Sequence, residues 1–180
     1  LELLPKEEAQ QVLDVGTGSG CLGITLAAER PLAQVTLVDI SEDALRVAQQ
    51  NAERLGVSER VSTLHSDLFA AVTAPAGGFD LIVSNPPYIP TGDLAGLMPD
   101  VIQHEPRLAL DGGRDGLDCV RALVTGARQQ LRAGGALLIE IGIGQADACV
   151  ALLTAAGFTD ACAHKDLGRI PRVVEGRKPA

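Results

Sequence analysis

The sequence predicts an α/β fold: a doubly wound, mainly parallel seven-stranded sheet, with helices on both faces and an antiparallel pair of strands at its C-terminal side. Short runs of aliphatic and β-branched residues alternate with segments of helical periodicity, a pattern typical of βαβ units. Several runs are apolar at consecutive positions, as expected for strands buried on both faces. The chain has 180 residues, 46% of them hydrophobic, which is enough for one core. We therefore expect residues 1–180 to form a single domain.

Each expected element follows from a local pattern. Strands are expected at residues 12–15, 35–39, 61–65, 81–84 and 136–141, followed by two that can pair antiparallel at 159–163 and 172–176. Helices are expected at residues 21–29, 42–55, 117–132 and 146–156. The second helix has the clearest boundaries, because Ser41 is a good N-cap residue and Gly56 permits the turn that ends a helix.

The connection from residue 89 to residue 115 departs from this alternation. It is rich in proline and glycine, and we expect a short helical turn around residues 99–104. A connection of this length inside a compact domain is usually functional or partly disordered. Its place directly after a proline-rich motif at residues 84–90 favours a functional role.

Composition limits the classes of partner. The net charge is −8 and the isoelectric point is near 4.8, which argues against stable binding to nucleic acid, since that needs a basic surface. No apolar run approaches the ~20 residues of a membrane span, and the first residues do not resemble a signal peptide. We expect a cytoplasmic protein without a membrane partner or a stable oligomer. The first residue is not Met, so we also expect upstream residues to be missing.

The cysteines and histidines are widely spaced and form no C-x-x-C pair or other recognisable metal-ligand spacing. They are Cys21, Cys119, Cys149, Cys162, His65, His104 and His164. The spacing is typical of cysteines that act as small hydrophobic residues in a reducing compartment. We therefore expect neither a metal nor a disulfide.

A glycine-rich turn separates the first strand from the first helix. It consists of Gly16, Thr17, Gly18, Ser19 and Gly20. Glycines let the backbone turn sharply and approach a ligand closely, while the N–H groups of the following helix point at that ligand. Residues 18–23 also fit the dinucleotide pattern G-x-G-x-x-G. The turn therefore predicts a nucleoside-containing cofactor and leaves NAD and S-adenosylmethionine as alternatives.

Three acidic residues favour S-adenosylmethionine. Asp14 precedes the first glycine, where a carboxylate suits a cationic sulfonium group and repels a pyrophosphate. Asp39 ends the second strand, where a ribose-binding acid is expected. Asp67 follows the third strand and can accept a hydrogen bond from an adenine amino group. The predicted cofactor-binding residues are Asp14, Gly16, Thr17, Gly18, Ser19, Gly20, Asp39, Ile40, Asp67, Leu68 and Asn85.

The motif S-N-P-P-Y-I-P at residues 84–90 ends the fourth strand with groups that suit a planar NH₂ acceptor. The Asn85 side-chain oxygen and the Pro86 carbonyl can each accept one hydrogen of such a group. Prolines fix the backbone and bring no competing N–H donor. Tyr88 can cover the planar acceptor. We therefore predict Asn85, Pro86 and Tyr88 as catalytic residues, with Pro87 as a further substrate-binding residue.

The order V-L-D-V-G-T-G-S-G, V-D-I-S, S-D-L-F and I-V-S-N-P-P-Y-I-P resembles the class I S-adenosylmethionine-dependent methyltransferases. The later segments E-P-R-L-A-L and R-V-V-E-G-R narrow the resemblance to the release-factor glutamine methyltransferases. The resemblance covers nearly the whole chain.

The resemblance implies methyl transfer to the glutamine of the Gly-Gly-Gln motif in class 1 peptide release factors, with the amide held by Asn85, Pro86 and Tyr88. We also expect Glu105 and Arg107 to order the long connection, with a direct contact to the substrate as the less favoured alternative. The family usually carries a helical N-terminal domain that helps to bind the release factor, and we expect this chain to start after that domain.

Other functions remain open from the sequence. A methyltransferase for exocyclic amines of adenine or guanine in DNA or RNA can use the same acceptors on a flipped base. A cofactor-binding scaffold without catalysis and an NAD-dependent oxidoreductase also share the glycine-rich turn. The acidic charge disfavours the first alternative, and the intact N-P-P-Y motif disfavours the scaffold.

Overall fold

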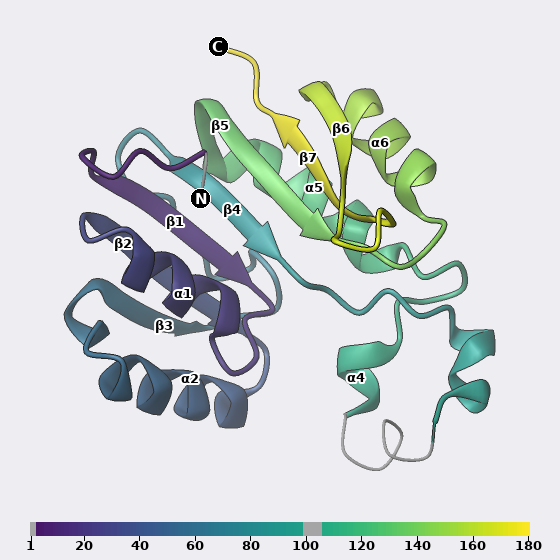
Figure 1. Ribbon diagram of the computed structural model, residues 1–180, viewed down its shortest axis with the longest axis horizontal. Helices are drawn as coiled ribbons and strands as arrows, with labels where there is room; N and C mark the ends of the chain where they lie inside the picture. Colours follow the sequence, from purple (N-terminus) through teal and green to yellow (C-terminus); the bar gives the residue numbers. More distant parts are fainter. Residues whose placement is uncertain (1–2, 99–105) are drawn as a thin grey trace.

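A computed structural model describes residues 3–98 and 106–180, which form a seven-stranded sheet with helices on both faces (Figure 1). The strands are β1 (Gln10–Val15), β2 (Ala33–Asp39), β3 (Val61–His65), β4 (Phe79–Ser84), β5 (Leu131–Glu140), β6 (Thr159–Lys165) and β7 (Pro171–Arg177). Their order is β3-β2-β1-β4-β5-β7-β6, and β7 is antiparallel to both of its neighbours while the other pairs are parallel. The predicted fold class is confirmed.

The helices connect these strands. They are α1 (Cys21–Glu29), α2 (Glu42–Arg54), α4 (Arg107–Leu110), α5 (Asp118–Gln130) and α6 (Ala146–Ala155), with the 3₁₀ helices η1 (Ser58–Arg60) and η2 (Thr91–Gly96). As predicted, the Ser41 hydroxyl caps α2 by accepting a hydrogen bond from the Ala44 amide at 3.2 Å. Among the residues described, no helix is long and apolar enough to cross a membrane.

The predicted helix at residues 117–132 is too long at its C-terminal end. Helix α5 ends at Gln130, and β5 begins directly at Leu131, which is 2% exposed and pairs with Phe79. The apolar periodicity wrongly predicted Leu131 as part of the helix, because a buried leucine is equally compatible with a helix and with a strand. The predicted turn at residues 99–104 lies outside the described residues.

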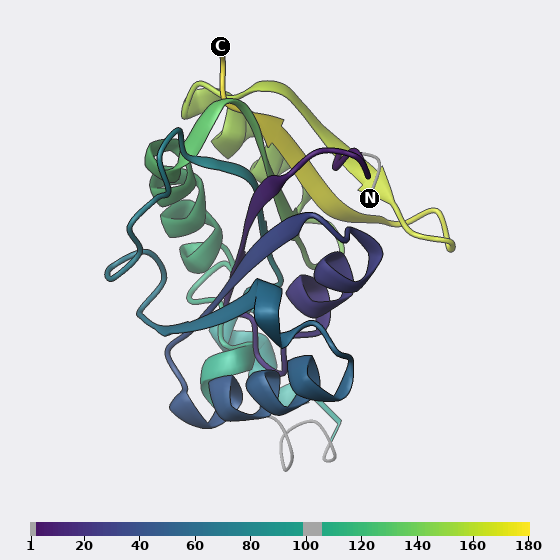
Figure 2. The same cartoon turned by 90° about the vertical axis from the view of Figure 1, so that its left-hand side faces the viewer.

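The core has one layer on each face of the sheet, and Figure 2 shows α5 and α1 on opposite sides. Alternate strand residues supply the two layers, as the period of two requires. In β1, Leu13 packs in the layer that contains α5 and α6, whereas Val12 packs in the layer that contains α1 and α2. Both residues are fully buried.

The strand order reverses between β1 and β4. The chain passes from β1 to β2 on one side, and β4 later pairs with the other side of β1. In open α/β sheets, ligands bind outside the carboxyl ends of the strands at such a switch point. In Figure 1 the arrowheads of β1 and β4 point toward the segment that carries α4.

Candidate functional site

The glycine-rich turn leaves β1 at the switch point with space around its first two glycines. Gly16 and Gly18 have φ values of 68° and 56°, and a Cβ added to either would meet no atom within 4 Å. A Cβ on Gly20, by contrast, would lie 2.4 Å from Ile24 Cδ1, so packing excludes a side chain there. The backbone at Gly16 and Gly18 is therefore open to close approach by a ligand.

Asp14 lies beneath this turn and is only 1% exposed. Its Oδ2 accepts hydrogen bonds from the Thr17 hydroxyl at 2.6 Å and from the Gly23 amide at 2.9 Å. Its Oδ1 is buried and has no hydrogen-bond partner among the described residues. Burial raises the pKa of Asp14 from 3.8 to about 6, against the opposing effect of the two hydrogen bonds. Asp14 thus connects the turn to α1 through its Oδ2 atom. Its Oδ1 atom receives no hydrogen bond from the residues that the structure describes.

Asp39 ties the turn to the end of β2. Its Oδ2 accepts a hydrogen bond from the Gly18 amide at 2.8 Å, and its Oδ1 accepts one from the Ser41 amide at 2.9 Å. The Thr17 amide donates to the Val38 carbonyl at 2.9 Å. Each carboxylate oxygen has a second lone pair, so Asp39 keeps the capacity to accept a hydrogen bond from a ribose hydroxyl, and that contact stays a prediction.

Asp67 and Leu68, which are predicted to lie near the adenine of the cofactor, follow the end of β3 close to Asp39. The Ser66 amide donates to the Asp39 carbonyl at 3.0 Å, which brings the two strand ends together. Asp67 is exposed, and Ile40 is 46% exposed. Leu68 has a φ of 47°, a left-handed conformation that is unfavourable for a leucine. Backbone strain of this kind is frequent at ligand sites.

The S-N-P-P-Y-I-P motif begins beside the glycine turn. Ser84 pairs with Val15 in the sheet, and the Ser84 hydroxyl donates to the Val15 carbonyl at 2.7 Å. The next residues, Asn85 and Gly16, therefore leave adjacent strands at the same edge. Asn85 is exposed and Pro86 is buried. The structure thus brings the two predicted motifs together.

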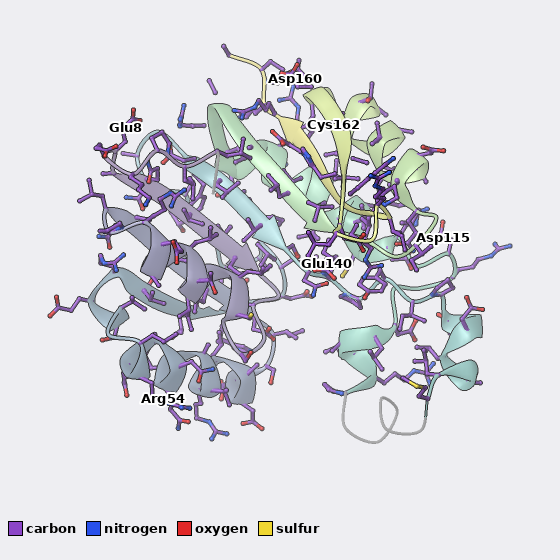
Figure 3. All side chains as sticks on the ribbon, viewed as in Figure 1. Glu8, Arg54, Asp115, Glu140, Asp160 and Cys162 are labelled. Carbon is purple, nitrogen blue, oxygen red and sulfur yellow. The ribbon has the colours of Figure 1, made fainter. Side chains whose placement is uncertain are left out.

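Residues far along the chain hold Tyr88 in place. Gln145, at the N-cap of α6, donates its side-chain amide to the Tyr88 carbonyl at 2.9 Å. Arg172 in β7 places its guanidinium carbon 5.5 Å from the centre of the Tyr88 ring and donates to the Tyr88 hydroxyl at 3.3 Å. Glu140, at the end of β5 (Figure 3), lies 3.5 Å from Arg172. A Cβ on Gly116 would lie 2.3 Å from the Tyr88 carbonyl oxygen.

Sequence reasoning missed this support for Tyr88. Arg172 lies in the segment R-V-V-E-G-R that contributed to the family resemblance, which was the one available signal. Gln145 follows the segment Gly142-Ile143-Gly144, and no sequence pattern marks it as a functional residue.

The two ends of the long connection at residues 89–115 contact each other. Ile89 forms a parallel bridge with Asp111, and the Ile89 amide donates to the Leu110 carbonyl at 3.0 Å. Asp111 accepts from the Thr91 hydroxyl at 2.7 Å and pairs with Arg107 at 3.3 Å. These hydrogen bonds lower the pKa of Asp111, the contact with Thr91 most of all. Arg107 thus pairs with a residue of the same connection, and its predicted role in ordering that connection stays a prediction. Glu105 lies outside the described residues.

Comparison with known proteins agrees with this geometry. Residues 1–114, which include the glycine turn and N-P-P-Y, match the methyltransferase small domain family. The chain belongs to this family.

Comparison of this methyltransferase domain with curated proteins identifies a narrower group of relatives. The domain is 49% identical over 94% of its length to the release factor glutamine methyltransferase of Geobacter sulfurreducens, and covers 58% of that protein. It is 47% identical over its whole length to the protein of the same name from Cereibacter sphaeroides, and covers 64% of it. The predicted family resemblance is confirmed. The chain spans about three fifths of the length of these relatives.

Solved structures share the fold of this methyltransferase domain. A methyltransferase from Pyrococcus furiosus aligns with a TM-score of 0.72 at 17% identity, covering 98% of this chain and 78% of that one. The 16S rRNA N2 G1207 methyltransferase of T. thermophilus, solved with AdoMet and guanosine, aligns with a TM-score of 0.67 at 25% identity. That alignment covers 98% of this chain and 40% of the other.

Proposed function

We propose that the protein transfers a methyl group from S-adenosylmethionine to the side-chain amide nitrogen, N5, of the glutamine in the Gly-Gly-Gln motif of class 1 peptide release factors. The observation that carries the proposal is the pairing of Val15 with Ser84, which places the glycine turn and N-P-P-Y at one edge of the sheet. The names of the relatives support the acceptor. A translation factor as substrate is consistent with a cytoplasmic reaction.

The residues around the turn fit a cationic, nucleoside-containing donor. The Asp14 Oδ1 atom is a buried acceptor that receives no hydrogen bond from residues 3–98 or 106–180, and the backbone at Gly16 and Gly18 is open. The Asp39 carboxylate and the exposed Ile40 and Asp67 continue this surface at the ends of β2 and β3. When bound, S-adenosylmethionine supplies a methyl group activated by a positively charged sulfur.

The acceptor side has to align a weak nucleophile, since the lone pair of a glutamine amide nitrogen is delocalised into its carbonyl. The Asn85 side-chain oxygen and the Pro86 carbonyl accept the two N–H hydrogens and hold the nitrogen toward the methyl group. These oxygens also stabilise the positive charge that develops on the nitrogen. The new C–N bond replaces the S–C bond, and the acidified nitrogen then loses one proton to water. No dedicated general base is required.

The proposal is tested by labelled methyl transfer from S-adenosylmethionine to a release factor, with the complete protein as enzyme. We expect one methyl group per wild-type release factor and none on a variant in which alanine replaces the motif glutamine. The Asn85→Ala enzyme should bind the donor but transfer little label. Equal labelling of both release factors would contradict the proposed acceptor.

A second candidate is methylation of an exocyclic amine on a nucleic-acid base. The structural likeness to the rRNA N2 guanine methyltransferase favours it, because a base amine is also a planar NH₂ group. The net charge of −8 disfavours it. Label in RNA or DNA, with none in the release factor, would select this second function. Donor binding without transfer to any acceptor would indicate a scaffold instead.

A further inference from the structure

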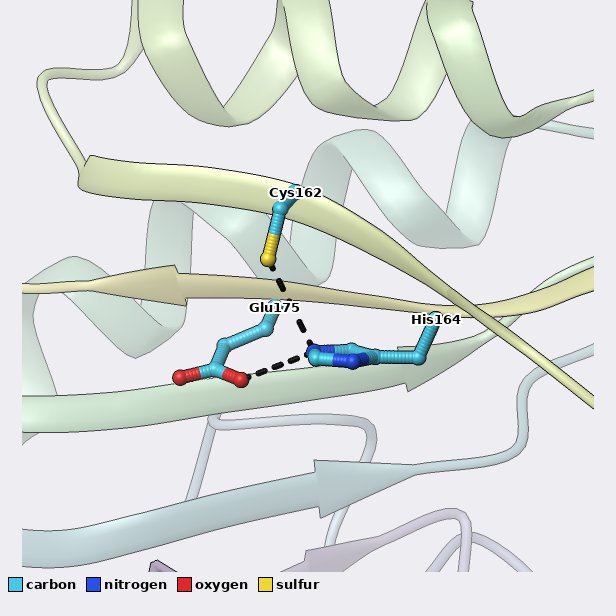
Figure 4. A group of neighbouring side chains, drawn as sticks. All are labelled: Cys162, His164 and Glu175. Atoms are coloured by element: carbon cyan, nitrogen blue, oxygen red, sulfur yellow. Dashed lines mark hydrogen bonds and ion pairs between the residues drawn. The ribbon is translucent and has the colours of Figure 1, made fainter.

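A cluster of three potential metal ligands lies on the antiparallel strands β6 and β7 (Figure 4). Cys162 and His164 are two residues apart on β6 and therefore share a face of the sheet. Glu175 on β7 is directly opposite Cys162 in the register of the pair. The sequence predicted no metal site, because the ligand spacing exists only once these two strands have paired.

One nitrogen atom connects the cluster. His164 Nε2 lies 2.9 Å from the Glu175 Oε2 atom and 3.7 Å from the Cys162 Sγ atom. The sulfur, nitrogen and oxygen atoms all lie within 4.8 Å of one another. A lone pair on nitrogen, a thiol and a carboxylate thus converge on one small volume.

This geometry does not fit a catalytic Cys-His-Glu triad. In such triads the imidazole bonds the nucleophile through one ring nitrogen and the acid through the other. Here the same nitrogen faces both partners, so the ring cannot connect them in series. In addition, burial and the nearby carboxylates of Glu175 and Asp160 raise the pKa of Cys162, whereas a nucleophilic thiol has a lowered one.

We propose that Cys162, His164 and Glu175 bind a zinc ion through Sγ, Nε2 and Oε2. A mixed set of one sulfur, one nitrogen and one oxygen ligand suits a borderline-soft cation such as Zn²⁺. Usual bond lengths in a tetrahedral zinc site separate sulfur from nitrogen by roughly 3.6 Å and nitrogen from oxygen by roughly 3.4 Å. The observed separations are 3.7 Å between sulfur and nitrogen and 2.9 Å between nitrogen and oxygen. The sulfur and the Glu175 oxygen lie within 4.8 Å of each other, where zinc needs roughly 3.6 Å, so side-chain rotations have to bring the three ligand atoms to these values. Binding forms a Zn–S bond and releases the thiol proton to solvent.

Arg177 completes the surroundings of the site. Its Nε lies 3.4 Å from the Glu175 Oε1 atom, which orients the carboxylate so that Oε2 faces His164. Hydrogen-bonded outer partners of this kind are usual for carboxylate ligands. The side chain of Glu175 is 11% exposed and that of His164 is 51% exposed, so a metal and a fourth ligand, water, can enter from solvent.

The site would join the edge strand β6 to β7. A ligand that binds the folded state raises its stability according to concentration and affinity. Zinc should therefore raise the unfolding temperature of the protein, and a chelator should reverse the increase.

Titration of the complete, metal-free protein with CoCl₂ tests the proposal, because cobalt bound to a thiolate has characteristic charge-transfer and d–d absorption. We expect saturation at one cobalt per chain and displacement of the spectrum by ZnCl₂. Cys162→Ser should abolish the charge-transfer band. His164→Gln should weaken metal binding by at least about tenfold, since even the loss of an outer-shell partner typically costs that much.

Cys21→Ser is the matched control, since Cys21 is also exposed but lies at the start of α1, outside the cluster. This variant should keep the wild-type spectrum and affinity. Circular dichroism of each variant confirms that it is folded. A Cys162→Ser spectrum equal to that of the wild type, or no charge-transfer band in the wild type at saturating cobalt, would overturn the proposal.

Discussion

The glycine turn at residues 16–20 and the N-P-P-Y motif leave adjacent strands at the same edge of the sheet, yet contacts of different range hold them. The turn depends on local partners: Asp14 bonds residues 3 and 9 positions away, and Asp39 bonds Gly18 at a separation of 21. Tyr88 depends on Gln145 and Arg172, which are 57 and 84 positions away. The proposed donor side, around the glycine turn, is therefore built within the first strands. The proposed acceptor side, around N-P-P-Y, needs the C-terminal half of the fold.

This difference suggests that the two sides can be disturbed separately. Substitutions in the turn should change donor affinity, and substitutions around Tyr88 should change the rate of transfer. For Asn85→Ala and Arg172→Met both quantities are measured on the same variant, because a change that affects both equally would contradict this separation.

The largest expected effect is that of Asn85→Ala. The variant loses the side-chain oxygen that we propose aligns the acceptor NH₂ group and stabilises its developing charge. We expect kcat to fall by roughly 100- to 1,000-fold, as when one stabilising group is removed from other active sites. The dissociation constant of S-adenosylmethionine, measured by calorimetry, should change far less than kcat, although Asn85 is also among the predicted cofactor-binding residues. A large loss of donor affinity would show that Asn85 belongs to the donor side.

A matched pair of glycine substitutions compares the two sides directly. Gly18→Ala and Gly116→Ala both place a side chain at positive φ, 56° and 76°. At Gly116 the new Cβ would also lie 2.3 Å from the Tyr88 carbonyl and 2.6 Å from Gln145 Nε2. We expect a total cost of about 2 kcal/mol for Gly116→Ala, roughly a 30-fold change in the folding equilibrium.

Gly18→Ala should cost less stability, about 1 kcal/mol, because its Cβ meets no atom of the protein. It should weaken donor binding more than Gly116→Ala does, since that Cβ enters the proposed donor space. Urea unfolding and calorimetry on both variants check these expectations. Equal donor affinities would be evidence against a donor at the turn.

The ionisation of Asp14 gives the third prediction. Burial raises its pKa to about 6, so the carboxylate is largely protonated at pH 5 and charged at pH 7.5. If the charged form attracts the sulfonium, donor affinity should fall by about tenfold per pH unit below pH 6. The Asp14→Asn variant should bind weakly at both values, without this pH dependence.

The same ionisation affects folding in the opposite direction. Because the pKa of Asp14 is higher in the folded state than its ordinary value of 3.8, the folded state binds the proton more tightly. Its contribution to stability is therefore greatest in acid and is lost as the pH rises from about 4 to 6. Urea unfolding at pH 4.5 and 7 should show this contribution in the wild type and its absence in Asp14→Asn.

The smallest expected effect is that of Arg172→Met. It removes the cation over the Tyr88 ring and the hydrogen bond to the Tyr88 hydroxyl. We expect kcat to fall by about two- to fivefold, in line with a cation–π contact of 0.5–1 kcal/mol, while donor affinity is kept. Arg128→Met is the control, since Arg128 lies 6.0 Å from the Phe158 ring, away from N-P-P-Y. An equal fall in kcat for the control would mean that the effect is a general loss of stability.

Much of the fold was accessible from the sequence because its elements carry local signals. Each of the seven strands was predicted near its observed position, and Cys21–Glu29 was predicted with both boundaries correct. The error at Leu131 arose where a helix passes directly into a strand without a glycine or proline between them.

The site was predictable only in part, because only some of its features carry local sequence signals. The proximity of the glycine turn and N-P-P-Y follows from strand order, so sequence reasoning could place them together. The roles of Gln145 and Arg172, and the convergence of Cys162, His164 and Glu175, depend on strand pairing and registers that no local pattern encodes. The hydrogen bonds of Asp14 inside the turn were equally inaccessible before the backbone was known.

The distant support of Tyr88 has a consequence for the protein while it is being made. Chains leave the ribosome from the N-terminus, so Asp14 in β1, Asp39 in β2 and Asp67 just after β3 emerge long before Arg172. When only the residues up to the end of β4 have emerged from the ribosome, we expect the nascent chain to contain the residues of the proposed donor side. The partner of the Tyr88 ring, Arg172, has not yet been made. The proposed acceptor side of this domain is thus completed only after β7 has been synthesised.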